Sequence, residues 1–291
     1  MTQRTATAVA HGAATIVNAM ATGQGAAFGV DLWTKAEVKL TSEPKVIQGE
    51  IQSDPTENTA LIEFAVARVL AHFKMENRLG AKIKTDSNIP IARGLKSSSV
   101  AANAVTLATV AALGKSLDDI AVINLGVDAA FDAKVTVTGA FDDACASYFG
   151  GIAVTDNTKR ALLTRAPLPE GLAVLFHVPP KKIYTANSDV NRLKTVAPLI
   201  KVAFREAENG SFWQALSLNG IIYSSAIGFD ASVALDALQA GAVAAGLCGK
   251  GPAVTAVVPD DRLDAVKIVL QKYEGEIIQT KFNQQKASVV K

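Results

Sequence analysis

Three consecutive serines follow a glycine turn at residues 90–99, which read PIARGLKSSS. A serine is a good helix N-cap, because its hydroxyl accepts a hydrogen bond from a free amide of the first helical turn. A glycine turn that opens a helix also offers unpaired backbone amides and the positive end of the helix dipole, and both attract phosphate. The segment by itself is compatible with an ordinary capped helix and with an anion-binding turn.

Two adjacent carboxylates, Asp142 and Asp143, stand in a segment that is otherwise small and apolar, at residues 139–151. An aspartate before an alanine-rich run is often a helix N-cap. The second aspartate and the flanking glycines leave one carboxylate available for chemistry, such as taking a proton from a hydroxyl. Both interpretations stay open on these residues alone.

Two further glycine-rich turns lie far apart in the chain. Residues 22–29 read TGQGAAFG and contain Gly23 and Gly25, whereas residues 248–252 read CGKGP and contain Gly249, Lys250 and Gly251. Glycine lets the backbone approach a ligand or another loop closely. Taken alone, the first turn indicates a hairpin connection and the second a tight turn before a strand.

Several familiar catalytic patterns are missing from the sequence. The P-loop pattern would use Lys96 and Ser97, but its first position falls at Ile89 or Pro90 rather than at a glycine. The glycine pair near residue 24 lacks the third glycine of a dinucleotide-binding turn. No G-x-S-x-G motif is present, and three histidines leave little material for a serine-hydrolase triad.

The composition predicts a folded cytoplasmic protein. Hydrophobic residues make up 49% of the 291 residues, which allows one large domain or two ordinary ones. The 29 basic and 27 acidic residues are interleaved, so we expect no nucleic-acid partner. The chain has no apolar run that suggests a signal peptide or a membrane span, so we expect no membrane partner. Cys145 and Cys248 lack metal-ligand spacing, and reduced thiols are expected.

The periodicity of apolar residues predicts an α+β fold rather than a doubly wound sheet. A strand at residues 82–86 leads directly into the serine segment, which is the context that an anion-binding turn requires. Loops near residues 160–170 predict a domain boundary. The other predicted strands are at 14–20, 35–40, 46–51, 134–138, 172–178, 253–258 and 277–282, and the predicted helices are at 59–74, 97–114, 117–125, 189–207, 211–226, 231–243 and 262–273.

Taken together, the motifs resemble those of the GHMP kinases. The pattern Pro90-x-x-x-Gly94-Leu95-x-Ser97-Ser98 is similar to the central phosphate-binding motif of that superfamily, and residues 248–253 are similar to its C-terminal glycine motif. Residues 141–144 resemble the stretch where mevalonate kinases carry a catalytic aspartate. The resemblance implies a two-domain fold, with a ribosomal-protein-like α/β domain at residues 1–165 and a ferredoxin-like α+β domain at residues 166–291.

Within the superfamily, the sequence most resembles the archaeal-type shikimate kinases. The resemblance rests on Lys96, where most relatives have glycine or alanine, and on the opening stretches at residues 12–19 and 22–29. It implies ATP and Mg²⁺ as cofactors, phosphorylation of the shikimate 3-hydroxyl, and a monomer or homodimer. A homoserine or mevalonate kinase would share the phosphate features, and a non-catalytic member would be expected to lose the aspartate or the serines.

The resemblance also implies roles for individual residues. Asp142, or Asp143 as the alternative, would act on the attacking hydroxyl, with Lys96 as a charge over the phosphates or as a solvated lysine, and Ser98 would face Mg²⁺. Candidates for the cation that meets the shikimate carboxylate are Arg93, Lys181, Lys182 and Arg192. The nucleotide would contact Pro90, Ile91, Ala92, Arg93, Gly94, Leu95, Lys96, Ser97, Ser98 and Ser99, and the substrate would contact Gly23, Gly25, Arg93, Asp142, Gly249, Lys250 and Gly251.

Overall fold

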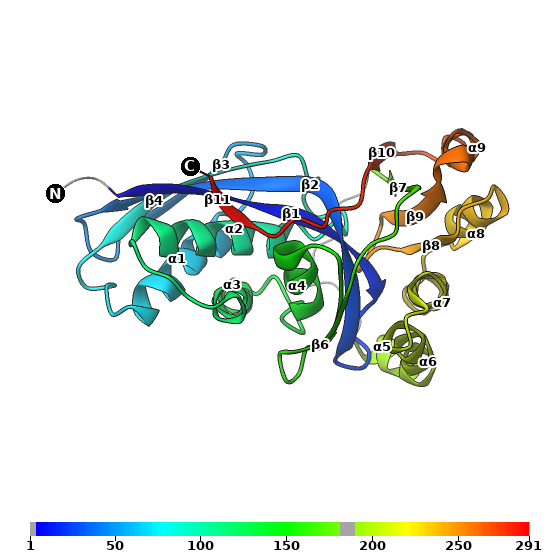
Figure 1. The fold of residues 1–291 in the computed structure, drawn as a ribbon, viewed down its shortest axis with the longest axis horizontal. Helices are drawn as coiled ribbons and strands as arrows, with labels where there is room; N and C mark the ends of the chain where they lie inside the picture. Colours follow the sequence, from blue (N-terminus) through cyan, green and yellow to red (C-terminus); the bar gives the residue numbers. More distant parts are fainter. Residues whose placement is uncertain (1–3, 181–189, 291) are drawn as a thin grey trace.

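The computed structural model describes residues 4–180 and 190–290. Its larger sheet has seven strands and forms the body of the first half of the chain (Figure 1). The order is β11-β1-β2-β4-β3, and β5 pairs with β2 and with β6. The strands are β1 (Thr5–Val17), β2 (Gln24–Thr41), β3 (Ile47–Ile51), β4 (Gly80–Ser87), β5 (Ile152–Asp156), β6 (Ala161–Ala166) and β11 (Ser288–Val290).

The long strand β2 has two different partners along its second edge. Its first residues pair with β5, in a register that sets Gly25 opposite Thr155, and its last residues pair with β4. All pairs in this sheet are antiparallel except β3 with β4. The start of β2 is buried on both faces, whereas residues 34–41 mostly alternate between buried and accessible positions, as expected of a strand with one covered face.

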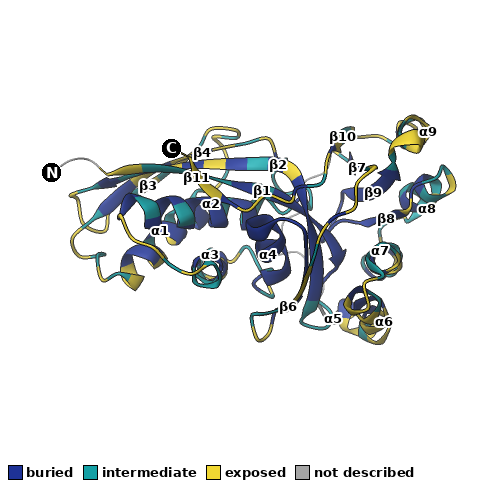
Figure 2. Ribbon diagram, viewed as in Figure 1, coloured by how far each residue is buried: buried dark blue, intermediate teal, exposed yellow. Residues whose placement is uncertain are grey.

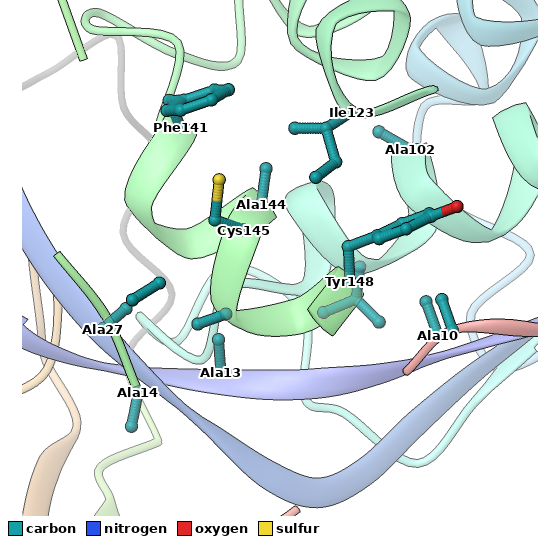
Figure 3. Packing of buried hydrophobic residues seen from close by; sticks show 14 of the residues in the cluster. Ala10, Ala13, Ala14, Ala27, Ala102, Ile123, Phe141, Ala144, Cys145 and Tyr148 are labelled. Atoms are coloured by element: carbon teal, nitrogen blue, oxygen red, sulfur yellow. The ribbon is translucent and has the colours of Figure 1, made fainter. Parts of the chain in front are cut away.

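Three helices, α1 (Ala60–His72), α2 (Ser97–Ala112) and α4 (Phe141–Phe149), cover one face of this sheet, and α3 (Asp119–Asp132) packs on their outer side (Figure 1). Every residue of α4 is buried. Figure 3 shows its Ala144, Cys145 and Tyr148 among residues of β1, α2 and α3, and small side chains such as Ala13 allow this close packing. The helix that carries Asp142 and Asp143 is therefore held from several sides.

A second sheet, in the order β10-β7-β9-β8, forms the other half of the molecule. Figure 2 shows the strands of this sheet buried except β10 at its edge, with accessible surface on the outer helices and the loops. Its strands are β7 (Leu172–Val178), β8 (Ala244–Leu247), β9 (Val254–Pro259) and β10 (Glu276–Thr280). The helices here are α5 (Val190–Thr195), α6 (Ala197–Glu208), α7 (Phe212–Ile227), α8 (Ser232–Gln239) and α9 (Leu263–Leu270), which follows a 3₁₀ turn at Asp260–Arg262.

The structure corrects several predicted elements. Residues 134–138 are irregular rather than a strand, because Lys134, with a φ of 56°, turns the chain away after α3. The helix predicted at 189–207 is two helices, with a proline in the first turn of α6, and the helix predicted at 231–243 ends at Gln239 so that β8 can form. Strands β5, β6, β8 and β11 were not predicted, because they are short or lie in segments that indicated loops or helices.

The end of the chain returns to the first sheet. Strand β11 pairs with β1, so that both termini lie at the same end of the molecule (Figure 1). Strand β6 ends at Ala166 and β7 begins at Leu172. The predicted boundary between residues 165 and 166 stays a prediction. In the part of the chain that the structure describes, no helix combines the length and the apolar character needed to cross a bilayer.

Candidate active site

A cavity of about 350 Å³ lies where the glycine-rich segments meet. Segments that are far apart in the sequence contribute to its wall, including the turn after β1 and the loop before β9. The cavity is lined by residues 18–20, 94, 96–99, 140, 142–143 and 249–251, and also by Ile51, Ser53, Glu57, Asn58, Leu61, Ile62, Ile91, Ala101, Ala130 and residues 134–138.

The start of α2 presents free backbone amides to this cavity. Lys96, in the left-handed region with a φ of 63°, is the N-cap of the helix, and no side chain caps it. The interpretation of the serines as N-caps is therefore wrong. The amides of Ser97, Ser98 and Ser99 belong to the first helical turn, where the helix itself provides no acceptor, and all three residues line the cavity. This arrangement suits an anion.

The serine segment packs against the distant glycine turn. Gly94 has a φ of +87°, and a Cβ atom there would lie 2.5 Å from the carbonyl oxygen of Cys248. A Cβ atom at Gly249 would lie 2.7 Å from Nζ of Lys96, and the amide of Ala253 donates to the carbonyl of Arg93. Gly94 has no room for a side chain because the backbone of the other loop lies against it, and Gly249 has a φ of +60°, which favours glycine.

We expect Gly94→Ala to lower the free energy of unfolding by about 1–3 kcal/mol and to weaken ATP binding, because the new methyl group must push the two loops apart. Gly114→Ala is a matched control, since Gly114 has a φ of +65° but no atom within 4 Å of the point that a Cβ would occupy. Urea unfolding and ATP titration measure both effects. Equal losses of stability and of ATP binding in the two variants would show that the contact between the two loops contributes to neither.

A buried ion pair joins the serine segment to α4. Nζ of Lys96 lies 2.9 Å from Oδ2 of Asp143, and the two side chains are 12% and 7% exposed. Burial lowers the pKa of Lys96, but the charges of Asp143 and Asp142 outweigh it and raise that pKa above its ordinary value. Lys96 therefore carries its positive charge in the cavity wall beside Asp143, and its interpretation as a solvated lysine is wrong.

Asp142 is held differently from its neighbour. Nδ2 of Asn157 donates to Oδ1 of Asp142 at 2.8 Å, and the backbone amide of Asp142 donates to Oδ1 of Asn157 at 3.2 Å. Burial and the charge of Asp143 raise the pKa of Asp142 to about 7, despite the opposing effects of Lys96 and Asn157. A carboxylate with that pKa can take up and release a proton near neutral pH. The N-cap of α4 is Ala140, so neither aspartate is the cap.

Comparison with known proteins finds relatives that are similar in sequence and relatives that are similar in fold. Residues 60–151 match the family model described as the GHMP kinases N terminal domain. A shikimate kinase of Methanosarcina mazei is 45% identical over 95% of this chain and 94% of its own length.

The chain belongs to the GHMP kinases.

Other relatives agree with this assignment. A shikimate kinase of Pyrococcus abyssi is 41% identical over 88% of this chain and 93% of its own length. Among solved structures, the Methanococcus jannaschii mevalonate kinase has a TM-score of 0.75 at 16% identity, covering 95% of this chain and 98% of its own. Lactococcus lactis galactokinase complexed with galactose has a TM-score of 0.76 at 14% identity, covering 98% and 95%. These structural neighbours show that the α+β fold predicted for the chain is the two-domain GHMP kinase fold.

The structure does not bring every predicted site residue to the cavity of this GHMP kinase. Pro90, Arg93 and Leu95 do not line it; Leu95 is buried, and the Arg93 guanidinium donates to the carbonyl of Pro179. Gly23 and Gly25 do not line it either. The predicted members that do line it are Ile91, Ala92, Gly94, Lys96, Ser97, Ser98, Ser99, Asp142, Asp143, Gly249, Lys250 and Gly251.

Gly25 contributes in another way than predicted. A Cβ atom at Gly25 would lie 2.5 Å from Oδ2 of Asp142. The glycine therefore makes room for the carboxylate. Of the candidates for a substrate-binding cation, Arg192 lies exposed on α5 and does not line the cavity, and Lys181 and Lys182 lie outside the described residues.

Asn18 lies in the opening stretch at residues 12–19, which gave it no role of its own, and in the structure it joins the turn after β1 to the loop before β9 and to α7. Its Nδ2 donates to the carbonyl of Gly249 at 2.8 Å, and its Oδ1 accepts from the hydroxyl of Tyr223 at 3.2 Å. The amide of Gly249 donates in turn to Oγ1 of Thr15 at 3.0 Å. These buried hydrogen bonds fix the distant glycine turn against the end of β1. Their partners are 231, 205 and 234 residues apart in the chain, which explains why local patterns miss them.

Proposed function

We propose that this GHMP kinase transfers the γ-phosphoryl group of ATP to the 3-hydroxyl of shikimate. The observation that carries the proposal is the 45% identity, over nearly the whole of both chains, to a protein named shikimate kinase. The cavity supports it, because free helix amides, a lysine and a carboxylate that titrates near neutral pH line the same space.

Phosphoryl transfer needs mainly positioning and charge neutralisation. The amides at the start of α2 would bind the phosphates, with Lys96 adding positive charge, and Gly249 and Gly251 would hold the phosphate loop from behind. Asp142 would accept the proton of the 3-hydroxyl as that oxygen attacks the γ-phosphorus and ADP leaves. Asp143 would keep Lys96 in place through their ion pair.

The donor groups of the cavity fit a magnesium ion that arrives with the nucleotide. Mg²⁺ takes oxygen ligands and often keeps only one or two from the protein, together with substrate phosphates. The described residues contain no group of three or more His, Cys, Asp or Glu side chains that could hold a metal on its own. Ser98 offers a hydroxyl at the head of α2 and is the residue that would hold Mg²⁺ there, where the ion would neutralise phosphate charge.

The proposal is tested with purified protein, Mg²⁺-ATP and a panel of shikimate, homoserine and mevalonate. We expect ATP consumption to depend on shikimate, with formation of shikimate 3-phosphate. Turnover of homoserine or mevalonate in its place would overturn the choice of acceptor. Homoserine and mevalonate kinases share the fold at 16% and 17% identity, and this degree of likeness says nothing about the acceptor.

We also propose that Lys250 binds the carboxylate of the acceptor. It lines the cavity beside the Lys96–Asp143 pair, whereas Arg93 does not line it. Burial and the charge of Lys96 lower the pKa of Lys250 to about 8, so it is still mainly charged at pH 7. A bound carboxylate would offset the repulsion between the two lysines.

We expect Lys250→Ala to raise the KM for shikimate by about 10- to 100-fold, the value of one hydrogen bond to a charged group, with little change in the KM for ATP. Steady-state kinetics measure both constants, and Lys272→Ala, at an exposed position just after α9, serves as the control. An equal rise in the KM for ATP would assign Lys250 to the phosphates and contradict the proposal.

A further inference from the structure

The pairing of β2 with β5 places Gly25 and Asn157 directly against Asp142, with Thr155 behind Asn157. Gly25 is opposite Thr155 in this antiparallel pair, and Asn157 follows the end of β5. Asp142 lies in the first turn of α4, which packs on β2 and β5. Gly25 and Asn157 therefore form a socket for the carboxylate, and Thr155 supports Asn157 from behind.

The orientation of the Asn157 amide in this socket follows from its partners. The backbone amide of Asp142 can only donate, so the group that faces it must be the oxygen Oδ1 of Asn157. That oxygen also accepts from the hydroxyl of Thr155 at 2.7 Å. The nitrogen Nδ2 is then directed to Oδ1 of Asp142 at 2.8 Å. Thr155 and Asn157 are both buried, so water does not compete for these bonds.

The two oxygens of Asp142 consequently have different surroundings. Oδ1 accepts the hydrogen bond from Asn157, and Oδ2 lies over Gly25, where a Cβ atom would come within 2.5 Å of it. Any side chain at Gly25 would displace Oδ2. An oxygen that already accepts a strong hydrogen bond is a weaker base than its neighbour, because that bond favours the ionised form.

We propose that Asn157, held in place by Thr155, is a positioning residue that fixes Asp142 so that Oδ2 takes the proton of the acceptor hydroxyl. This inference rests on the proposed function, in which Asp142 is the base. The other groups whose charge reaches Asp142 are Asp143 on α4 and Lys96 at the head of α2. Cys145 and Tyr223 are near enough to sense Asp142, and burial raises the pKa of each, so they stay neutral near pH 7.

The test compares Asn157→Ala and Thr155→Val with Thr164→Val, which changes an exposed threonine on the neighbouring strand β6. We expect Asn157→Ala to lower kcat by about 10- to 100-fold, as a small misplacement of a catalytic group can, while the KM for ATP changes less than about twofold. Thr155→Val should cause a smaller loss of the same kind, and Thr164→Val should cause none.

The pH dependence separates positioning from a general loss of structure. The hydrogen bond from Asn157 lowers the pKa of Asp142. Removing it should therefore shift the acid limb of the pH profile of kcat, the range over which kcat rises with pH, from near pH 7 to higher pH. A merely structural defect would lower kcat at every pH without moving the limb. An unchanged limb in both Asn157→Ala and Thr155→Val would overturn the inference.

A second measurement tests the inference independently of the choice of substrate. Carboxyl NMR of protein labelled at aspartate reports the pKa of Asp142 without any turnover, and Asp142→Asn identifies its signal. We expect a higher pKa in Asn157→Ala than in the wild type, and Thr155→Val serves if Asn157→Ala does not fold. An inactive wild type with this shift would refute shikimate as the acceptor and support the socket. Equal pKa values in wild type and variant would refute the socket itself.

Discussion

Replacing Asp142 with asparagine is expected to lower kcat for shikimate by about 10²- to 10⁴-fold, the usual contribution of a general base, while ATP binding stays near the wild-type value. The wild-type enzyme should gain activity as the pH rises through about 7, because the ionised carboxylate accepts the proton and the pKa of Asp142 is raised to about 7. In Asp142→Asn, kcat should no longer rise with pH around 7. Rapid-quench kinetics and calorimetric ATP titration measure the two effects.

Two comparisons make this result specific. Asp261→Asn changes an exposed carboxylate near α9 and should leave kcat unchanged. Asp143→Asn removes the partner of Lys96 and should affect stability as well as turnover, unlike Asp142→Asn. If Asp142→Asn kept wild-type turnover and Asp143→Asn lost it with the fold intact, the base would be Asp143.

Lys96→Met is expected to lower the free energy of unfolding by about 3–5 kcal/mol, because it leaves the buried carboxylate of Asp143 without its counter-charge. Turnover should fall as well, since the proposed phosphate site loses a positive charge. Urea unfolding gives the change in stability. Arg68→Met is the control, since the side chains of the Arg68–Asp132 pair are 43% and 29% exposed and the pair should contribute only about 1 kcal/mol.

A double variant separates the structural role of Lys96 from its catalytic role. Lys96→Met combined with Asp143→Asn removes both charges, so much of the stability should return while turnover stays low. Recovery of turnover together with stability would show that the charge of Lys96 does not act on the phosphates. If Lys96→Met alone were as stable as the wild type, the buried Lys96–Asp143 pair would contribute nothing to stability.

The general form of this protein could be predicted from local sequence patterns. The predicted helix at 59–74 corresponds to α1, and the strand predicted at 82–86 lies within β4 and leads into the serine segment as expected. These elements were predictable because apolar periodicity reports which face of a local segment is buried. The residues that line the cavity could also be predicted in part, because each motif is contiguous in the sequence and Gly94, Ser98 and Asp142 were named from it.

How those residues work together depended on the folded chain. In the folded chain, Asp142 accepts a hydrogen bond from Asn157, whereas Asp143 forms an ion pair with Lys96. The Arg93 guanidinium points away from the cavity, to the carbonyl of Pro179. The fold also makes Gly25 a neighbour of the Asp142 carboxylate. These contacts join residues far apart in sequence through the pairing of β2 with β5 and through the packing of two glycine turns. Local periodicity contains no information on such pairings, so the partners of each carboxylate could be identified only in three dimensions.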